Sequence, residues 1–416
     1  KEMASAAAET KLALLPRRDL IRLADPVRRA LADTPYDPPP AGDAVVSAKS
    51  VLESLLPAAS GAGESLARAE ARDFCLCCAA LASAEGEESP HLYWIPKDLS
   101  RAGRSALREL SGSLSLGGER EMVCALMPEV LPLLKGVIKE SCVDPESDDV
   151  LASSAKAPVV YAIVAAHQFR WLVTQVSFPY LGKLCSLVIP CALTSLDHWS
   201  PEVKGPGMVT FVHLAKNVNS AELGWYEEPI LDACSRNIAS SDELWDRVVE
   251  MSVLLLTCVQ RGKPRSPWYE QILSEMLGHL ERQPTNKERR VAWLLRIEPL
   301  FNAMGLVLLA HFRRMFLLLF QWMHADDDET LVLVLDRVHT IAKLTWVRKS
   351  PFILRLIDEL TLAYKEAAMR KEREAIRSRI LHIFVLLQKC HGMQFETAWD
   401  KYKDDPDLPA LASFII

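Results

Sequence analysis

Hydrophobic residues recur every three or four positions along most of this chain, which is the spacing of one buried face of a helix. The clearest example is the stretch 178–260, which we interpret as two consecutive helical hairpins. Short polar turns at 197–201 and 240–242 separate the two helices of each hairpin. Leu196 and Ile238, which precede these turns, lie 42 positions apart. The pattern therefore predicts a repeated pair of helices.

A hairpin of this kind has one apolar face and cannot bury it alone, so neighbouring hairpins must stack to close a common core. The observed spacing is close to the period of roughly 40–47 residues in HEAT and armadillo units. Strand signals are weak, because no series of short alternating segments is bounded by Asn-Gly or Asp-Gly turns. We therefore predict an all-α fold, a right-handed α-solenoid of HEAT/armadillo-like helical hairpins.

The same periodicity, read with the proline-rich and polar stretches, divides the chain into parts. The parts are a weakly ordered lead with a proline-rich linker at 1–43, amino-terminal helical repeats at 44–140, a surface loop or boundary at 141–158, carboxy-terminal HEAT/armadillo-like repeats at 159–403 and a tail at 404–416. We expect the apolar end of the tail to dock on the last hairpin.

The last third shows the most regular pattern. It predicts a long apolar helix at 298–323 and a return helix at 330–346, with the acidic run 324–329 at the turn, where negative charge favours the start of a helix. Two further helices are predicted at 351–368 and 370–390. Cations and glutamates alternate over 364–381, which favours ion pairs three or four residues apart along a solvated helix face.

Charge and composition narrow the possible partners and compartment. The formal net charge of −6 disfavours nucleic acid and anionic membranes as partners. The most apolar stretch, 303–323, contains His311, Arg313 and Arg314, so it falls short of about 20 uninterrupted apolar residues. Ten cysteines are scattered through apolar runs, which is typical of a reducing compartment, and the first residues lack the pattern of a secretory signal. We expect a soluble cytoplasmic or nuclear protein.

Candidate chemistry is sparse. Cys75, Cys77 and Cys78 lack the second half of a zinc site, so we interpret them as packing residues of a helix. Gly205 and Gly207 have no preceding strand, which favours a close helix contact over a phosphate-binding loop. The histidines show neither metal-ligand spacing nor a nearby nucleophile with an orienting group. We expect no enzyme activity, no catalytic, cofactor-binding or metal-binding residues, and no cofactor.

In a helical scaffold, exposed tryptophan and arginine side chains are the best candidates for contacts with a partner. Trp199 lies in one repeat turn, and Trp346, Arg348 and Lys349 lie in another. Because turns line an edge of a solenoid, we predict that these four residues contact a partner. The alternative is that each tryptophan only caps its own hairpin.

Two stretches carry a resemblance to a known family. The first, from Leu187, contains LDHWSPEVKGPGMVTFVHLAKNVNSAELGWY; the second, from Leu300, contains a helix, the acidic turn HADDDE and a helix ending in Thr-Trp. In this arrangement, over roughly 159–387, the chain resembles the Tel-two-interacting protein two family, the third subunit of the Triple-T co-chaperone complex.

The resemblance implies an α-solenoid without catalytic residues that binds a larger HEAT-repeat subunit of that complex. Through the complex it would assist the heat-shock-ninety chaperone machinery in maturing phosphatidylinositol three-kinase-related kinases (PIKKs). The alternative, from the repeat pattern itself, is an armadillo-like peptide- or protein-binding adaptor in transport or ubiquitin-ligase assembly. A ladder of asparagines on successive helices would favour peptide binding, and only Asn217 and Asn219 suggest one.

Overall fold

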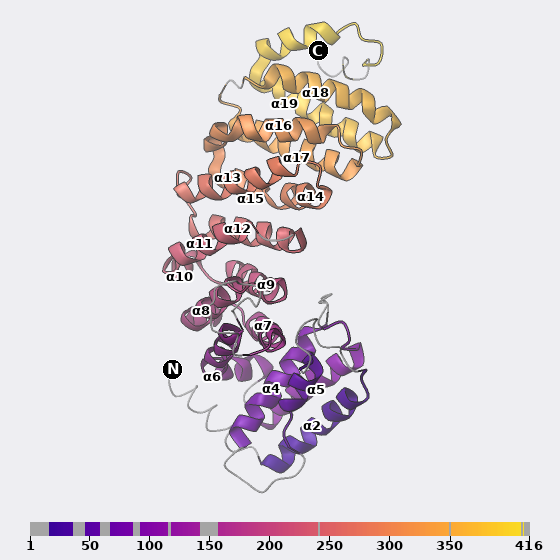
Figure 1. The fold of residues 1–416 in the computed structure, drawn as a ribbon. Coiled ribbons are helices and arrows are strands. Elements are labelled where there is room, and N and C mark those ends of the chain that lie inside the picture. Colours follow the sequence, from indigo (N-terminus) through magenta and orange to yellow (C-terminus); the bar gives the residue numbers. More distant parts are fainter. Residues whose placement is uncertain are drawn as a thin grey trace, which may run out of the picture. The chain divides into compact units, whose positions relative to one another are not determined.

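The structure, a computed structural model, is helical throughout the residues that it describes (Figure 1). These are residues 16–35, 46–58, 67–85, 92–114, 118–141, 157–239, 242–348, 351–408 and 411. No strand occurs among them. The chain forms two compact units, residues 1–233 and 234–416.

Unit 1 contains helices that pack as successive antiparallel pairs. They are α2 (Arg17–Ala32), α3 (Ala48–Ser54), α4 (Ala67–Ser83), α5 (Lys97–Ser113), α6 (Glu119–Glu140), α7 (Val159–Thr174), the 3₁₀ segment η2 (Leu181–Leu184), α8 (Cys185–Leu196), α9 (Pro201–Asn217) and α10 (Ser220–Gly224). Helix α6 packs on α7 and α8, and α7 packs on α9, so the hairpins stack in two layers. Helix α11 (Glu227–Asn237) contains the boundary between the units.

Unit 2 repeats the arrangement. Its elements are η3 (Asp242–Leu244), α12 (Trp245–Val259), α13 (Pro267–Arg282), α14 (Lys287–Arg296), α15 (Glu298–Met304), η4 (Gly305–His311), α16 (Phe312–Met323), α17 (Asp328–Thr345), α18 (Ile353–Glu366), η5 (Ala367–Met369), α19 (Arg373–Trp399) and η6 (Asp400–Tyr402). One layer holds α12, α14 with α15, α17 and α19, and the other holds α13, α16 and α18. The predicted all-α fold of HEAT/armadillo-like hairpins is confirmed.

Local sequence explains why the hairpins form where predicted. Pro201 and Pro267 occupy the first turns of α9 and α13, where a missing backbone N–H costs nothing and the fixed φ suits a helix. Gly207 allows α9 to approach α8 closely, since a Cβ built there would lie 2.8 Å from the Cβ of Ser195. The close helix contact predicted for this glycine is confirmed.

The predicted single helix at 298–323 is wrong. The segment forms α15, the 3₁₀ segment η4 and α16, because the chain leaves the α-helical conformation at Gly305, where φ is +53°. The prediction also missed α14, whose amphipathic sequence begins at Lys287 directly after the N-cap residue Asn286. Together α14 and α15 form the return partner of α13, and α16 starts the next hairpin.

By length and composition, 298–323 is also the one segment within the described residues apolar enough to cross a membrane, with a mean hydropathy of 1.7 and 50% of its most apolar window buried. In the structure this segment is interrupted by η4 and packs against α17, as core helices of unit 2 do.

Only some of the predicted loop, lead and tail segments fall within the described residues. Helices α6 and α7, which flank 141–158, pack together within unit 1. Residues 142–156 and most of the lead, 1–15 and 36–45, lie outside the described residues. In the tail, Leu408 and Leu411 are buried and Asp405 accepts a hydrogen bond from Lys365 of α18 at 2.5 Å, while the end of the tail, 412–416, lies outside the described residues.

Candidate partner-binding surface

The amino ends of the second helices of unit 2 are tied together by arginine and aspartate side chains. Arg289 at the start of α14 pairs with Asp242, which precedes α12. The neighbouring Arg290 donates to the carboxylate of Asp327, the N-cap residue of α17, at 2.5 Å. Arg370, which precedes α19, donates to Asp328 at 3.1 Å. Each helix in this layer is thus linked to the next at the same end, and we call this end the turn edge.

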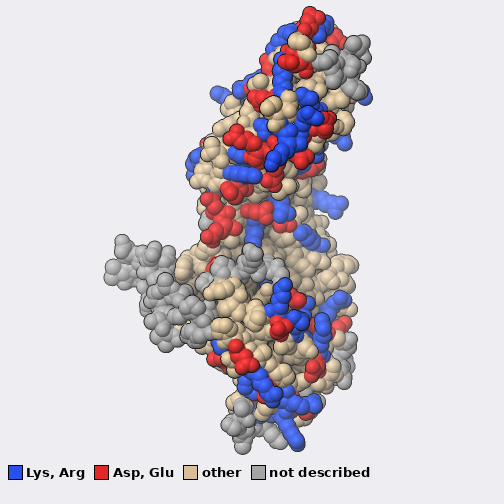
Figure 2. All heavy atoms as spheres, turned by 90° about the vertical axis from the view of Figure 1, so that its right-hand side faces the viewer, with Lys and Arg blue, Asp and Glu red and all other residues tan. Residues whose placement is uncertain are grey.

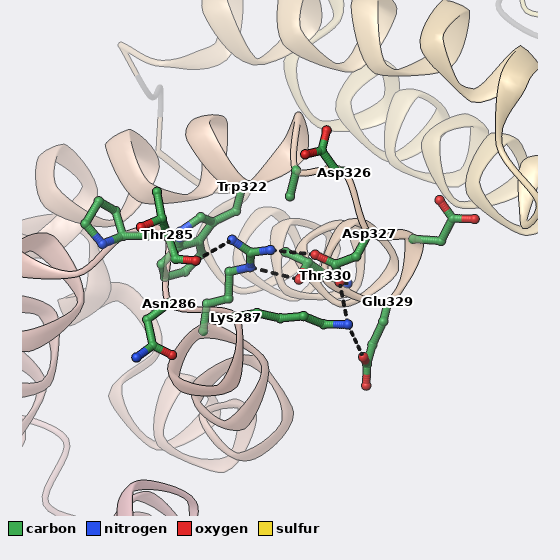
Figure 3. A network of polar contacts seen from close by, with 12 residues as sticks. Thr285, Asn286, Lys287, Trp322, Asp326, Asp327, Glu329 and Thr330 are labelled. Carbon is green, nitrogen blue, oxygen red and sulfur yellow. Dashed lines mark hydrogen bonds and ion pairs between the residues drawn. The ribbon is translucent and has the colours of Figure 1, made fainter. Parts of the chain in front are cut away.

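Figure 3 shows the middle link at close range. Arg290 also donates to the hydroxyl of Thr330 at 3.0 Å, and Lys287 lies 3.5 Å from Asp327 and 3.3 Å from Glu329. Burial opposes ionisation of Asp327, but hydrogen bonds from the backbone N–H and hydroxyl of Thr330 and from Arg290 outweigh it and lower the pKa of the carboxyl group to about 2. The acidic turn therefore caps α17, as predicted, and also binds α14.

A second row of ion pairs links the same helices further along their length. Arg296 bridges α14 to Asp246 of α12 at 3.1 Å, Arg337 of α17 lies 2.7 Å from Glu298 of α15, and Arg379 of α19 lies 2.8 Å from Asp336 of α17. Acidic and basic side chains consequently lie side by side on the face of unit 2 shown in the upper part of Figure 2.

The basic run 364–381 contributes to these rows and is also partly exposed. Arg370 and Arg379 pair with carboxylates of α17 rather than with residues three or four positions away. The guanidinium of Arg377 stacks over the ring of Tyr364, 4.6 Å from its centroid. Residues 371–374 are exposed, so part of the run faces solvent as predicted, while the rest joins α19 to its neighbours.

The opposite ends of the same helices differ in chemistry. Since α12, α14 with α15, and α17 lie in register at the turn edge, their carboxyl ends lie together at the other edge, roughly 25 Å away at a rise of 1.5 Å per residue. The connections to the next hairpins that begin there are 260–266, 305–311 and 346–352, and residues 349 and 350 of the last one lie outside the described residues. We call this row of three stretches the connection edge.

The connection edge is basic and partly apolar. Its three stretches contain no Asp or Glu. Exposed cations and apolar side chains lie along it: Arg261, Lys263, Arg265, Leu306, Trp346, Val347 and Arg348. Trp346 is 56% exposed and Val347 is 50% exposed. A tryptophan this exposed beside arginine is the composition found at anchoring points of protein interfaces.

Two of the four predicted contact residues therefore belong to one stretch of this edge. Trp346 and Arg348 are exposed there, and Lys349 lies outside the described residues. Their contact with a partner stays a prediction.

Trp199 is placed differently. It lies between the two helices of a hairpin, α8 and α9, whereas Trp346 follows the second helix of its hairpin, so the two tryptophans do not occupy equivalent turns. Its indole Nε1–H donates to the carbonyl of Ser141 at 3.2 Å, and its ring stacks on His198 with 5.6 Å between centroids. His198 is buried against the same carbonyl, and burial lowers the pKa of its imidazole to about 4. Trp199 thus contacts the C-cap residue of α6 as well as its own turn, and it remains 39% exposed, so both its contact with a partner and the capping alternative stay predictions.

Unit 1 has exposed aromatic residues that the sequence interpretation missed. Phe178, Tyr180 and Trp225 are 67%, 46% and 87% exposed, and they lie in the connections before α8 and before α11. The two connections are in contact, because the carboxylate of Glu222 lies against Gly182. The predicted hairpins began at Phe178 and had turns only at 197–201 and 240–242, so the sequence carried no signal that these rings lie in connections.

The groups considered for metal chemistry are packed in the core. Cys75, Cys77 and Cys78 are buried in α4, which confirms their predicted packing role, and burial raises the pKa of Cys75 and of Cys77 to about 12. Within the described residues, no group of three or more His, Cys, Asp or Glu side chains is placed to hold a metal ion.

Fold and surface together define a helical-repeat protein of the HEAT type. The structure of Kap95 in a Kap95:Nup1 complex has a similar fold, with a TM-score of 0.51 over 95% of this chain and 43% of that chain, at 14% identity. At this identity the similarity shows the fold alone.

Sequence relatives give the family. The chain is 52% identical over 412 residues to an Arabidopsis thaliana protein described as Uncharacterized protein At2g39910, covering 95% of this chain and 94% of the relative, and it belongs to that protein's family. It is also 22% identical over 243 residues to human TELO2-interacting protein 2, which covers 54% of this chain and 48% of the human protein. The chain thus matches about half the length of the human relative. No model of a known protein family matches the chain.

Proposed function

We propose that this protein is a non-enzymatic scaffold subunit of a co-chaperone complex that supports the folding, assembly and stability of PIKK-family kinases. The observation that carries the proposal is the similarity over 243 residues to a protein named for its interaction with TELO2. In the proposed role the chain binds the larger HEAT-repeat subunits of a Triple-T complex and acts on the kinases through the heat-shock-ninety machinery, in the cytoplasm, the nucleus or both.

The structure supports a binding role in two respects. A stack of helical hairpins exposes a large surface relative to its core, which suits extended contacts with other proteins. The polar side chains of unit 2 that form the turn edge are paired with one another, so they hold the scaffold together, whereas Trp346 and Arg348 are exposed at the connection edge.

The experiment is affinity purification of the tagged full-length protein from cells of its own species, followed by quantitative mass spectrometry. We expect the two larger Triple-T subunits in near-equal amounts and PIKK-family kinases in smaller amounts. Depletion of the protein should lower the level of those kinases without lowering their messenger RNA. Recovery of transport receptors or ubiquitin-ligase subunits, with neither Triple-T subunit present, would contradict the proposal.

A further inference from the structure

The connection edge combines three properties that point to one kind of ligand. It is continuous, because α12 packs on α15, α15 packs on α17, and α17 packs on η4. It is basic, and it ends in an exposed apolar group at Trp346 and Val347. The turn edge of the same helices contains at least as many carboxylates as cations, so the excess of positive charge is specific to the connection edge.

The local charge extends beyond the three stretches themselves. Exposed cations also lie in the adjoining helical turns, at Arg313 near the start of α16 and at Lys343 near the end of α17. One carboxylate lies near these cations, that of Glu270 in the first turn of α13, which interacts with His311 of the edge. A protein with a net charge of −6 therefore concentrates positive charge on one edge of unit 2. Such a concentration favours and steers the approach of a negatively charged partner.

The size of the edge limits that partner. Neighbouring helices pack about 8–10 Å apart, so the row of three connections spans roughly 20 Å. An extended peptide covers this distance with about six residues. We propose that the connection edge binds an extended acidic segment of a partner protein, with carboxylates on Arg261, Arg265 and Arg348 and a bulky apolar side chain against Trp346. This inference rests on the proposed function, because it supplies the site through which the scaffold would hold a partner subunit.

The first test measures binding of the full-length protein to a fluorescent peptide of about eight residues, acidic along its length and ending in Leu and Phe, by fluorescence anisotropy. Three variants are compared with the wild type. The triple variant R261E/R265E/R348E reverses the charge of the edge, and Trp346→Ala removes its apolar end. The matched control, K97E/R108E/K139E, changes the net charge equally at exposed positions of unit 1.

We expect the triple variant to bind the peptide at least roughly tenfold more weakly, since three exposed ion pairs are lost and replaced by repulsion. Trp346→Ala should weaken binding by roughly 30-fold if the indole anchors the peptide. The control should bind as the wild type does. Added salt should weaken binding of the wild type more than that of the triple variant, because exposed charges are screened.

Three results would overturn the inference: no binding of the peptide by the wild type, equal weakening by the control variant, or equally tight binding of single-stranded poly-uridine, which would make the edge a nucleic-acid site. Circular dichroism melts identify any variant that has lost its fold. If Trp346→Ala does not fold, Trp346→Phe replaces it. Because phenylalanine keeps an apolar ring, this variant should retain most of the binding.

The second test separates this inference from the proposed function. The edge variants and the control are used as baits in the affinity purification. If the wild type recovers the Triple-T subunits and the triple variant recovers them equally, the function stands and the connection edge is not the site. If the wild type recovers no such subunit but binds the peptide through the edge, the site stands and the co-chaperone role fails.

Discussion

Replacing Asp327 by alanine removes both the N-cap of α17 and the carboxylate that holds Arg290 of α14. Its neighbour Asp326 provides a matched control, since this carboxylate is exposed and points away from Asp327 and Lys287 in Figure 3. Asp327→Asn separates the two contributions, because asparagine is as good an N-cap residue as aspartate but carries no charge.

The magnitude follows from the environment of Asp327. Its pKa falls from 3.8 to about 2, and the side chain is only 22% exposed. At 1.36 kcal/mol per pKa unit, the ionised form stabilises the folded state by about 2 kcal/mol. We expect Asp327→Ala to destabilise unit 2 by about 2 kcal/mol and Asp327→Asn by about 1 kcal/mol, because the latter keeps the hydrogen bond to the Thr330 N–H. Asp326→Ala should change stability by less than about 0.5 kcal/mol.

The assay is amide hydrogen exchange with mass spectrometry over α14 and α17, with urea unfolding as a global measure. Because the folded-state pKa lies below the unfolded value, the stabilisation is present above about pH 4 and is lost as the pH falls towards 2. The difference between wild type and Asp327→Ala should therefore be equal at pH 7 and pH 5 and smaller at pH 3. A loss below about 0.5 kcal/mol at pH 7, or a difference that grows on acidification, would refute the reasoning.

Three further predictions follow from packing and charge. Gly207→Ala should lower stability by about 1–3 kcal/mol in thermal melts, because the added Cβ would collide with α8. The control Gly136→Ala lies in open space on α6 and should raise stability by up to about 1 kcal/mol. An equal effect of the two substitutions would contradict the close helix contact. Phe384→Ala should cost about 3–5 kcal/mol in urea unfolding, since its buried ring packs on two other aromatic rings of α19; a cost below about 1 kcal/mol would show that this cluster is not part of the core. Burial lowers the pKa of His324, but its ion pairs with two glutamates of α18 outweigh this effect, so the pKa is raised. The protonated imidazole should therefore stabilise the fold fully below pH 6.5, and this stabilisation should be lost as the pH rises through the folded-state pKa. His324→Gln should therefore reduce stability more at pH 5.5 than at pH 8, and the opposite order would be incompatible with these ion pairs.

Local signals were enough to predict most hairpins. The Ser-Pro pairs that begin α9 and α13 and the acidic turn before α17 act within a few residues, so the sequence shows them directly. The break at Gly305 was not predictable in this way, because the apolar periodicity continues through it. A helix and a 3₁₀ segment of similar composition bury similar residues, and packing against α17 decides between them.

The candidate surface was predicted only in part. Trp346 and Arg348 were recognised because bulky and charged side chains in a turn are visible in the sequence. The sequence did not reveal the difference between the turn edge and the connection edge, because this difference depends on which turns lie at the same end of the stacked helices. The pairing of Arg290 with Asp327 is equally invisible, because the residues lie 37 positions apart and several other arginines could have met that carboxylate.

The turn between α16 and α17 carries two adjacent aspartates that serve opposite neighbours: Asp327 holds the preceding α14, and Asp328 holds the following α19. This acidic turn thus lies between two basic neighbours, Arg290 on one side and Arg370 on the other. Loss of the hairpin would bring these two arginines together, and its duplication would bring Asp328 of the first copy against Asp327 of the second. In evolutionary terms, the alternation of charge favours one order and number of hairpins at this point of the stack.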